Sequence, residues 1–95
     1  MADLTPRLRN RIRRDFPVGT ADEVARRLAG LTTEAFGGQD QERVMAAIVL
    51  ASAGQWERFL AVIRLMALDW RDVLVAGELA HPAWRARLDA ELPDT

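Results

Sequence analysis

The stretch Gln41–Gly54, which reads QERVMAAIVLASAG, decides the fold of this chain. Apolar side chains fill nearly every position from Val44 to Ala51, whereas a helix on the surface of a protein carries a single apolar face. Asp40 precedes the stretch as a helix cap, and Gly54 ends it as a stop. We therefore predict a central helix over residues 41–53, buried on most sides, around which the rest of the chain packs.

Apolar residues recur every three or four positions on both sides of this helix, which is the period of an α-helix. No segment shows the sustained alternation of apolar and polar residues that is typical of a strand. The sequence thus predicts an all-α fold, a compact bundle of five to six short helices in a single domain spanning residues 1–95. Besides the central helix, we expect helices over residues 6–16, 21–29 and 55–68, one that begins at Asp69, and one over residues 82–92.

Capping signals place the ends of these helices. They are Thr5, the capping-box pair Thr20 and Glu23, and Asp69 at N-terminal ends, Pro82 at a first helical position, and Gly30 and Pro93 as C-terminal stops. Gly30 suits the left-handed geometry that often closes a helix. The longest break is residues 31–39, in which Thr32–Phe36 can form one short turn before Gly37 and Gly38 free the backbone.

The composition excludes several classes of protein. The 95 residues include thirteen arginines, no lysine and no cysteine, and the formal net charge is −1. Without cysteine the chain can form no disulfide, no thiolate zinc site and no cysteine nucleophile. The longest apolar run, Met45–Gly54, is much shorter than the about 20 residues of a membrane-spanning helix, and no apolar segment follows the first arginines as in a secretory signal. We therefore expect a cytoplasmic protein that does not enter a membrane.

Residues suited to catalysis or to metal binding are scarce. The only histidine, His81, stands at a predicted helix start, and the only serine, Ser52, stands in the apolar central helix. Asp69 and Asp72 lie one turn apart at another helix start, where carboxylates satisfy free backbone N–H groups. No glycine-rich phosphate loop and no zinc-ligand spacing is present. We expect no enzymatic activity, no metal site and no cofactor.

The predicted helix 6–16 carries the main concentration of basic charge. Residues 1–31 hold seven arginines against four acids, and residues 32–95 hold six against ten. Five arginines flank the apolar stripe of this first helix, namely Arg7, Arg9, Arg11, Arg13 and Arg14. Arginine binds phosphate through a bidentate, permanently charged fork, so a nucleic-acid backbone is one candidate ligand. The alternative is that the helix docks at the periphery of the core and its arginine stems cover apolar edges.

Four aromatic residues are candidate anchors, either of the core or of an interface: Trp56, Trp70, Trp84 and Phe36. Tryptophan, arginine and methionine are enriched at protein interfaces. Six short helices can also leave an apolar face uncovered, and such a face marks a partner groove or a dimer contact. We expect Phe36 to pin the 31–39 break to the core.

Three stretches in the C-terminal two-thirds resemble small uncharacterised proteins of high-GC actinobacteria. They are ERVMAAIVLA at residues 42–51, DWRDVLVA at residues 69–76 and WRARLD at residues 84–89. The resemblance covers about residues 40–92 and does not extend to the arginine-rich helix. It implies a compact helical domain in a bacterial cytoplasm, and it assigns no functional residue.

The expected function is that of a non-enzymatic interaction module, which binds a protein partner or a second copy of itself. The lack of catalytic residues and the content of tryptophan, arginine and methionine favour this interpretation. The alternative is a nucleic-acid accessory protein that uses the five arginines of the first helix.

Overall fold

The computed structural model describes residues 4–31, 33–36 and 38–92 of the chain. Six α-helices and one short helical turn follow one another in this part: α1 (Pro6–Asp15), α2 (Val18–Ala29), η1 (Thr33–Phe36), α3 (Gln41–Ser52), α4 (Trp56–Leu68), α5 (Trp70–Ala76) and α6 (Trp84–Glu91). No strand occurs within it. The predicted all-α bundle is confirmed.

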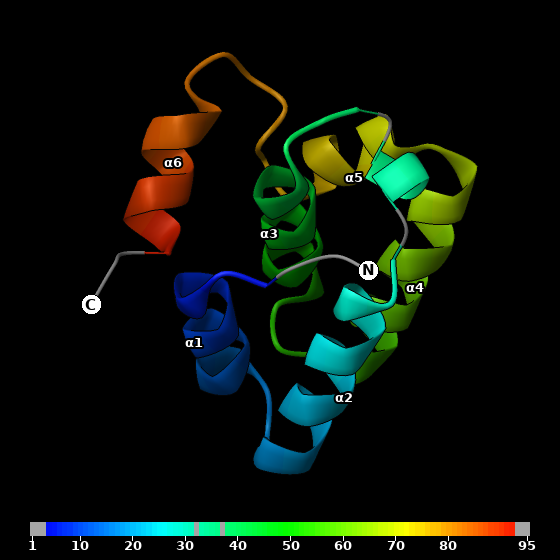
Figure 1. Cartoon of the computed structure of the whole chain (residues 1–95), viewed down its shortest axis with the longest axis vertical. Coiled ribbons are helices and arrows are strands. Elements are labelled where there is room, and N and C mark those ends of the chain that lie inside the picture. The colour runs from blue at the N-terminus through cyan, green and yellow to red at the C-terminus, as the bar shows by residue number, and fades with distance from the viewer. Residues whose placement is uncertain (1–3, 32, 37, 93–95) are drawn as a thin grey trace.

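Helix α3 lies at the centre of the molecule. All six residues of the run Val44–Val49 are fully buried, which requires neighbours on every side of the helix. Figure 1 shows α1 and α6 on one side of α3 and α4 and α5 on the other, and α3 contacts each of them. The predicted central helix is therefore confirmed, because its all-round apolar surface leaves no face for water.

Two glycines bring the backbones of different elements together. Gly77 follows α5, and a Cβ atom at this position would lie 2.5 Å from both the Cα and the carbonyl oxygen of Ala47 in α3. Gly54 follows α3 with a φ of +73°, and a Cβ there would lie 2.4 Å from the carbonyl oxygen of Asp15 at the end of α1. Both positions thus require a residue without a side chain.

Three predicted N-terminal caps are confirmed: Thr5 for α1, Asp40 for α3 and Asp69 for α5. Each side-chain oxygen accepts a hydrogen bond from a backbone N–H two or three residues later, at N–O distances of 3.4, 3.1 and 3.0 Å. These contacts satisfy donors that the first turn of a helix leaves free.

The predicted capping box at Thr20 and Glu23 is wrong. Helix α2 begins at Val18, directly after Pro17, whose carbonyl oxygen accepts a hydrogen bond from the Ala21 N–H at 2.7 Å. Thr20 therefore lies inside the first turn and cannot cap it. Glu23 lies further along the helix, where it forms ion pairs with arginines one turn later.

One further predicted helix start is also wrong. Helix α6 begins at Trp84 instead of Pro82, because the chain first makes a turn in which the Trp84 N–H donates to the His81 carbonyl oxygen. Gly30 ends α2 as predicted. Its geometry is right-handed instead of left-handed, with φ −78° and ψ −8°; the left-handed end belongs to Ala53 after α3. The expected roles of Thr32, Gly37 and Pro93 lie outside the described residues.

Replacing Gly77 by alanine tests the close approach of the chain after α5 to α3. The new methyl group would meet backbone atoms of Ala47, which cannot move aside, so Gly77→Ala should lower the free energy of unfolding by about 1–3 kcal/mol. Gly19→Ala is the matched control, because no atom lies within 4 Å of its Cβ position; it should be neutral or stabilising by up to about 1 kcal/mol. Urea unfolding followed by tryptophan fluorescence measures both, and equal stabilities would contradict the packing.

Candidate functional site

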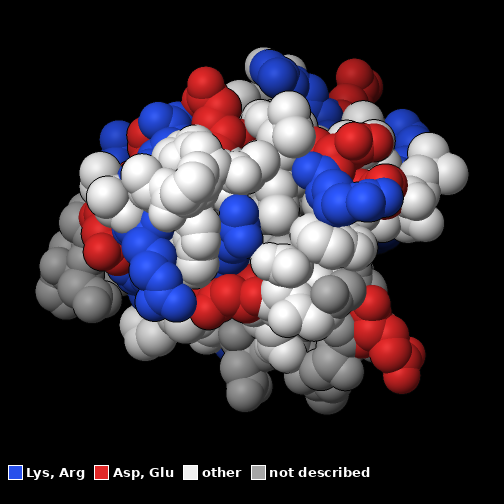
Figure 2. Space-filling model, turned by 90° about the horizontal axis from the view of Figure 1, so that it is seen from above, with Lys and Arg blue, Asp and Glu red and all other residues white. Residues whose placement is uncertain are grey.

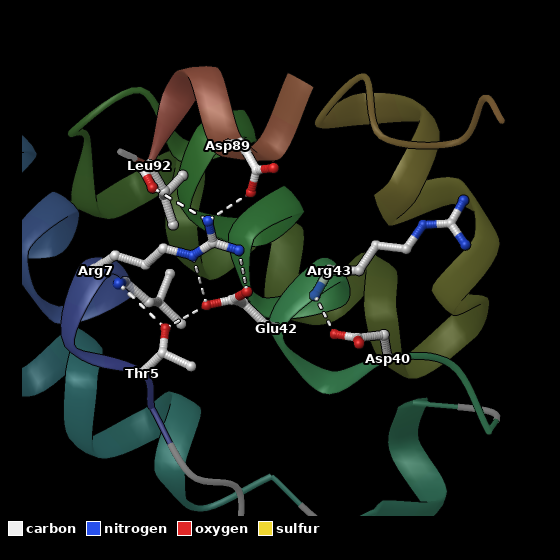
Figure 3. Close-up of polar contacts among 8 residues, drawn as sticks. Thr5, Arg7, Asp40, Glu42, Arg43, Asp89 and Leu92 are labelled. Atoms are coloured by element: carbon white, nitrogen blue, oxygen red, sulfur yellow. Dashed lines mark hydrogen bonds and ion pairs between the residues drawn. The ribbon is translucent and has the colours of Figure 1, made fainter. Parts of the chain in front are cut away.

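Arg7 of α1 is the centre of a polar cluster that joins three helices (Figure 3). Its Nε donates to Oε2 of Glu42 in α3 at 3.0 Å, and its Nη2 donates to the other carboxylate oxygen. Its Nη1 donates to Oδ1 of Asp89 in α6 at 2.7 Å and to the carbonyl oxygen of Leu92 at 3.4 Å. The Thr5 hydroxyl donates to the same Glu42 carboxylate. The Arg7 guanidinium is thus committed to contacts within the chain.

The hydrogen bonds of this cluster shift the pKa values of Arg7 and Glu42. The hydrogen bonds that Arg7 donates to Glu42, and then the one it donates to Asp89, raise the pKa of Arg7 above its already high ordinary value. The hydrogen bonds from Arg7 lower the pKa of Glu42, against the opposing effect of burial, and the Thr5 hydroxyl adds to the lowering. Both side chains are only 17% exposed, so the pair is poorly screened by solvent.

Arg11 makes a second connection between α1 and the C-terminal part of the chain. Its Nε donates to Oδ2 of Asp15 at 2.9 Å, within α1. Its Nη1 donates to the carbonyl oxygen of Glu91 at 2.6 Å and to Oε2 of that residue at 3.3 Å. Although burial disfavours the charged guanidinium, these hydrogen bonds and charges raise the pKa of Arg11.

The structure divides the five arginines of the predicted phosphate surface into two groups. Arg7 and Arg11 point to carboxylates of the same chain, and their side chains are 17% and 18% exposed. Arg9, Arg13 and Arg14 are exposed, and none of them forms an ion pair with a residue that the structure describes. Only these three remain available to an external ligand.

The four aromatic anchors occupy different environments. Phe36 is 1% exposed in the core. Trp56 is half-buried and stacks on the Phe59 ring at a centroid distance of 5.5 Å. Trp84 is also half-buried, and the guanidinium carbons of Arg43 and Arg85 each lie 4.8 Å from its ring centroid. The positive charge of each guanidinium is attracted to the electron-rich face of the Trp84 ring.

Trp70 lines a hollow on the surface of the described part of the chain. We call it the α4–α5 groove; its volume is about 650 Å³, and its lining residues are Glu34, Met66, Ala67, Leu68, Asp69, Trp70 and Arg71. Leu68, the last residue of α4, is 84% exposed at this groove. Val75 on α5 is 65% exposed. The groove therefore presents an exposed leucine to solvent beside a lining that is partly apolar and partly charged.

The charged residues that line the α4–α5 groove are two acids and one arginine, namely Glu34, Asp69 and Arg71. Arg71 donates to both carboxylate oxygens of Asp69, at 3.0 and 2.8 Å, and these hydrogen bonds lower the pKa of Asp69. That pair is internally neutral. Glu34 and Asp72 are exposed, and neither forms an ion pair with a described residue. Figure 2, which looks onto the end of the molecule where α5 lies, shows acidic and basic groups side by side among broad uncharged areas.

A second exposed apolar residue lies at the junction of α1 and α2. Val18 is 86% exposed as the first residue of α2. Arg13 and Arg14, in the last turn of α1, are also exposed. We call these three residues the Val18 corner. A hollow of about 320 Å³ lies next to it, lined by Gly19, Thr20, Glu23 and Trp56.

Neither Leu68 nor Val18 is among the site residues predicted from the sequence. For Leu68 a signal exists, because it lies two residues after the buried Met66 and therefore about 200° around the helix from it. A helical wheel of residues 56–68 would have placed Leu68 opposite the buried face of this helix. For Val18 no such signal exists, since its exposure depends on where α2 begins.

The structure also places the residues considered for catalysis. Ser52 is fully buried, and its hydroxyl donates to the Ile48 carbonyl oxygen at 2.6 Å. His81 is exposed in the turn before α6. Among residues 4–31, 33–36 and 38–92, no group of three or more histidine, aspartate or glutamate side chains is arranged to hold a metal ion. No helix in these ranges has both the length and the apolar character to cross a membrane.

Comparisons with protein-family models, with curated proteins and with solved structures find no match for this chain. The resemblance of residues 40–92 to small actinobacterial proteins therefore stays a prediction.

The Arg7–Glu42 pair predicts a specific pH dependence of stability. Because folding lowers the pKa of Glu42, its contribution is fully present above the unfolded-state pKa of about 4.3 and is lost as the pH falls through the folded-state pKa. Glu42→Gln should lower the free energy of unfolding by about 1–3 kcal/mol at pH 7. The difference from the unmodified chain should shrink as the pH is lowered below about 4.

Urea unfolding at a series of pH values measures this difference. Glu57→Gln is the control, because Glu57 is exposed and forms no ion pair in the described part of the chain. A loss of stability in Glu42→Gln that is the same at every pH would contradict the assignment.

Proposed function

We propose that this chain is a non-enzymatic protein-interaction module that binds a protein partner or a second copy of itself through the α4–α5 groove. The observation that carries the proposal is Leu68, an exposed leucine at a groove of about 650 Å³ whose lining is partly apolar and partly charged. Removing a leucine side chain from water contributes about 1.5–3 kcal/mol. A partner that covers Leu68 gains this free energy.

The chemistry of the groove supports a protein ligand. Trp70, which is half-buried in the groove, belongs to a residue type that is enriched at the centres of protein interfaces. The charged residues Glu34, Asp69 and Arg71 complete the lining, and such polar groups set the orientation of a bound chain.

The proposal includes the absence of catalysis and a location in the bacterial cytoplasm. The buried, hydrogen-bonded Ser52 and the exposed His81 support the first part, because a nucleophile needs an adjacent base and access to a substrate. The second part rests on the resemblance to actinobacterial proteins.

Nucleic-acid binding by α1 is the second candidate function. The exposure of Arg9, Arg13 and Arg14 favours it, since each can neutralise one phosphate. The commitment of Arg7 and Arg11 to carboxylates opposes it. The proposed protein-interaction function is therefore the better supported of the two.

Site-specific photo-cross-linking in cells tests the proposed function. With p-benzoylphenylalanine in place of Leu68, irradiation should yield a covalent adduct to a protein, either another copy or a different chain. Ala90 is the control position, because it is exposed on α6, on the opposite side of α3 from α4 (Figure 1). No adduct at position 68, or the same adducts from both positions, would overturn the proposal.

An electrophoretic shift assay tests the second candidate. At roughly 50 mM salt, where contacts to phosphate are strong, we expect no shift of duplex DNA or RNA that depends on α1. The test variant replaces Arg9, Arg13 and Arg14 by alanine, and the control replaces three other exposed arginines, Arg26, Arg58 and Arg64. Binding that the first variant loses and the second keeps would restore the nucleic-acid function.

A further inference from the structure

We infer that the α4–α5 groove takes the Val18 corner of a second copy of this chain, so that copies associate head to tail. The inference rests on the proposed function and names the occupant of its groove.

An exposed apolar residue of the Val18 corner matches apolar residues at the groove. Val18 is 86% exposed, more than any other large apolar residue in the described part of the chain. Pro17, which is also exposed, precedes it and restricts the backbone. A branched side chain held by a restricted turn loses little conformational entropy on binding. The groove offers the exposed Leu68 and the half-buried Trp70 as the apolar counterpart.

The two surfaces differ in the sign of their unpaired charge. Arg13 and Arg14 precede Val18 along the chain by five and four residues. Glu34 lines the groove, and Asp72 is exposed one residue beyond the last lining residue. Because opposite charges on two surfaces speed encounter and set orientation, the basic corner fits the acidic groove.

Ion pairs within one chain do not cancel the positive charge of the Val18 corner. Arg7 and Arg11, which belong to α1 but not to the corner, already bind carboxylates of the same chain. Asp22 lines a small hollow with Arg9 and Arg13 and offsets part of their charge. Arg14 is also exposed and forms no ion pair with a described residue, so the corner keeps a net positive charge.

The Val18 corner and the α4–α5 groove lie at opposite ends of one chain. In Figure 1, α2 begins at the lower end of the molecule and α5 lies at the upper end, and the molecule measures 32 Å along its longest axis. One chain therefore cannot place its own corner in its own groove. A contact between two copies leaves one corner and one groove free, which is the geometry of a ring or an open chain of subunits instead of a twofold dimer.

Two single variants test this arrangement, because each blocks one surface. Val18→Asp places a carboxylate on the corner, and Leu68→Asp places one at the groove. Both positions are more than four-fifths exposed, so both variants should fold, and circular dichroism checks this. Val75→Asp is the control, because Val75 is exposed but does not line the groove.

Sedimentation velocity measures the association from about 10 μM to 1 mM, the range of weak Kd values. The unmodified chain and Val75→Asp should form larger species as concentration rises, and this association should weaken at higher salt. Val18→Asp and Leu68→Asp should each stay monomeric, with association weakened at least tenfold. An equimolar mixture of the two should form a dimer and nothing larger, since one intact corner and one intact groove remain.

Three results would overturn the inference. They are an unmodified chain that is monomeric throughout, a Val18→Asp variant that associates like the unmodified chain, and a mixture that forms no dimer. A cross-link from position 68 to a different protein, together with a monomeric chain, would overturn this inference alone and leave the proposed function standing.

Discussion

The burial of α3 is the constraint on which the rest of the structure depends. The run Val44–Val49 has no surface in contact with water, and no polar side chain in it gives the helix an outward face. Other helices must therefore cover every side of it. Because other elements must cover α3, two backbone contacts are close. Gly77 contacts the α3 backbone, and Gly54 contacts the end of α1. Once α3 is covered, the remaining helices have outer faces that are free for other tasks.

The arginines of α1 show how the bundle uses charge to complete this cover. Arg7 and Arg11 join α1 to α6 through Asp89 and Glu91, and Arg7 also joins it to α3 through Glu42. Burying one partner of such a pair alone would be costly, so each guanidinium is held by several acceptors. The positive charge of the N-terminal part is thereby partly neutralised by acids of the C-terminal part, and the remainder is concentrated at Arg9, Arg13 and Arg14.

Local signals predicted most of the fold, and the limits of prediction have physical reasons. The apolar run of α3 and the caps Thr5 and Asp40 depend on neighbouring residues and are confirmed. The start of α2 was wrong because Pro17 opens the helix before the capping box. The roles of the arginines were beyond local reasoning, since Glu42 and Asp89 are 35 and 82 residues from Arg7 along the chain. Helical phase alone would have identified Leu68 as exposed.

Two distant surfaces, the Val18 corner and the α4–α5 groove, are proposed to bind each other between copies. A series of ¹⁵N–¹H correlation spectra of the unmodified chain at rising concentration tests this contact directly. Amide signals of residues 16–20 and 66–71 should shift together along one binding curve, while those of the buried run Val44–Val49 stay in place. Shifts confined to one of the two surfaces, or none at either, would contradict it.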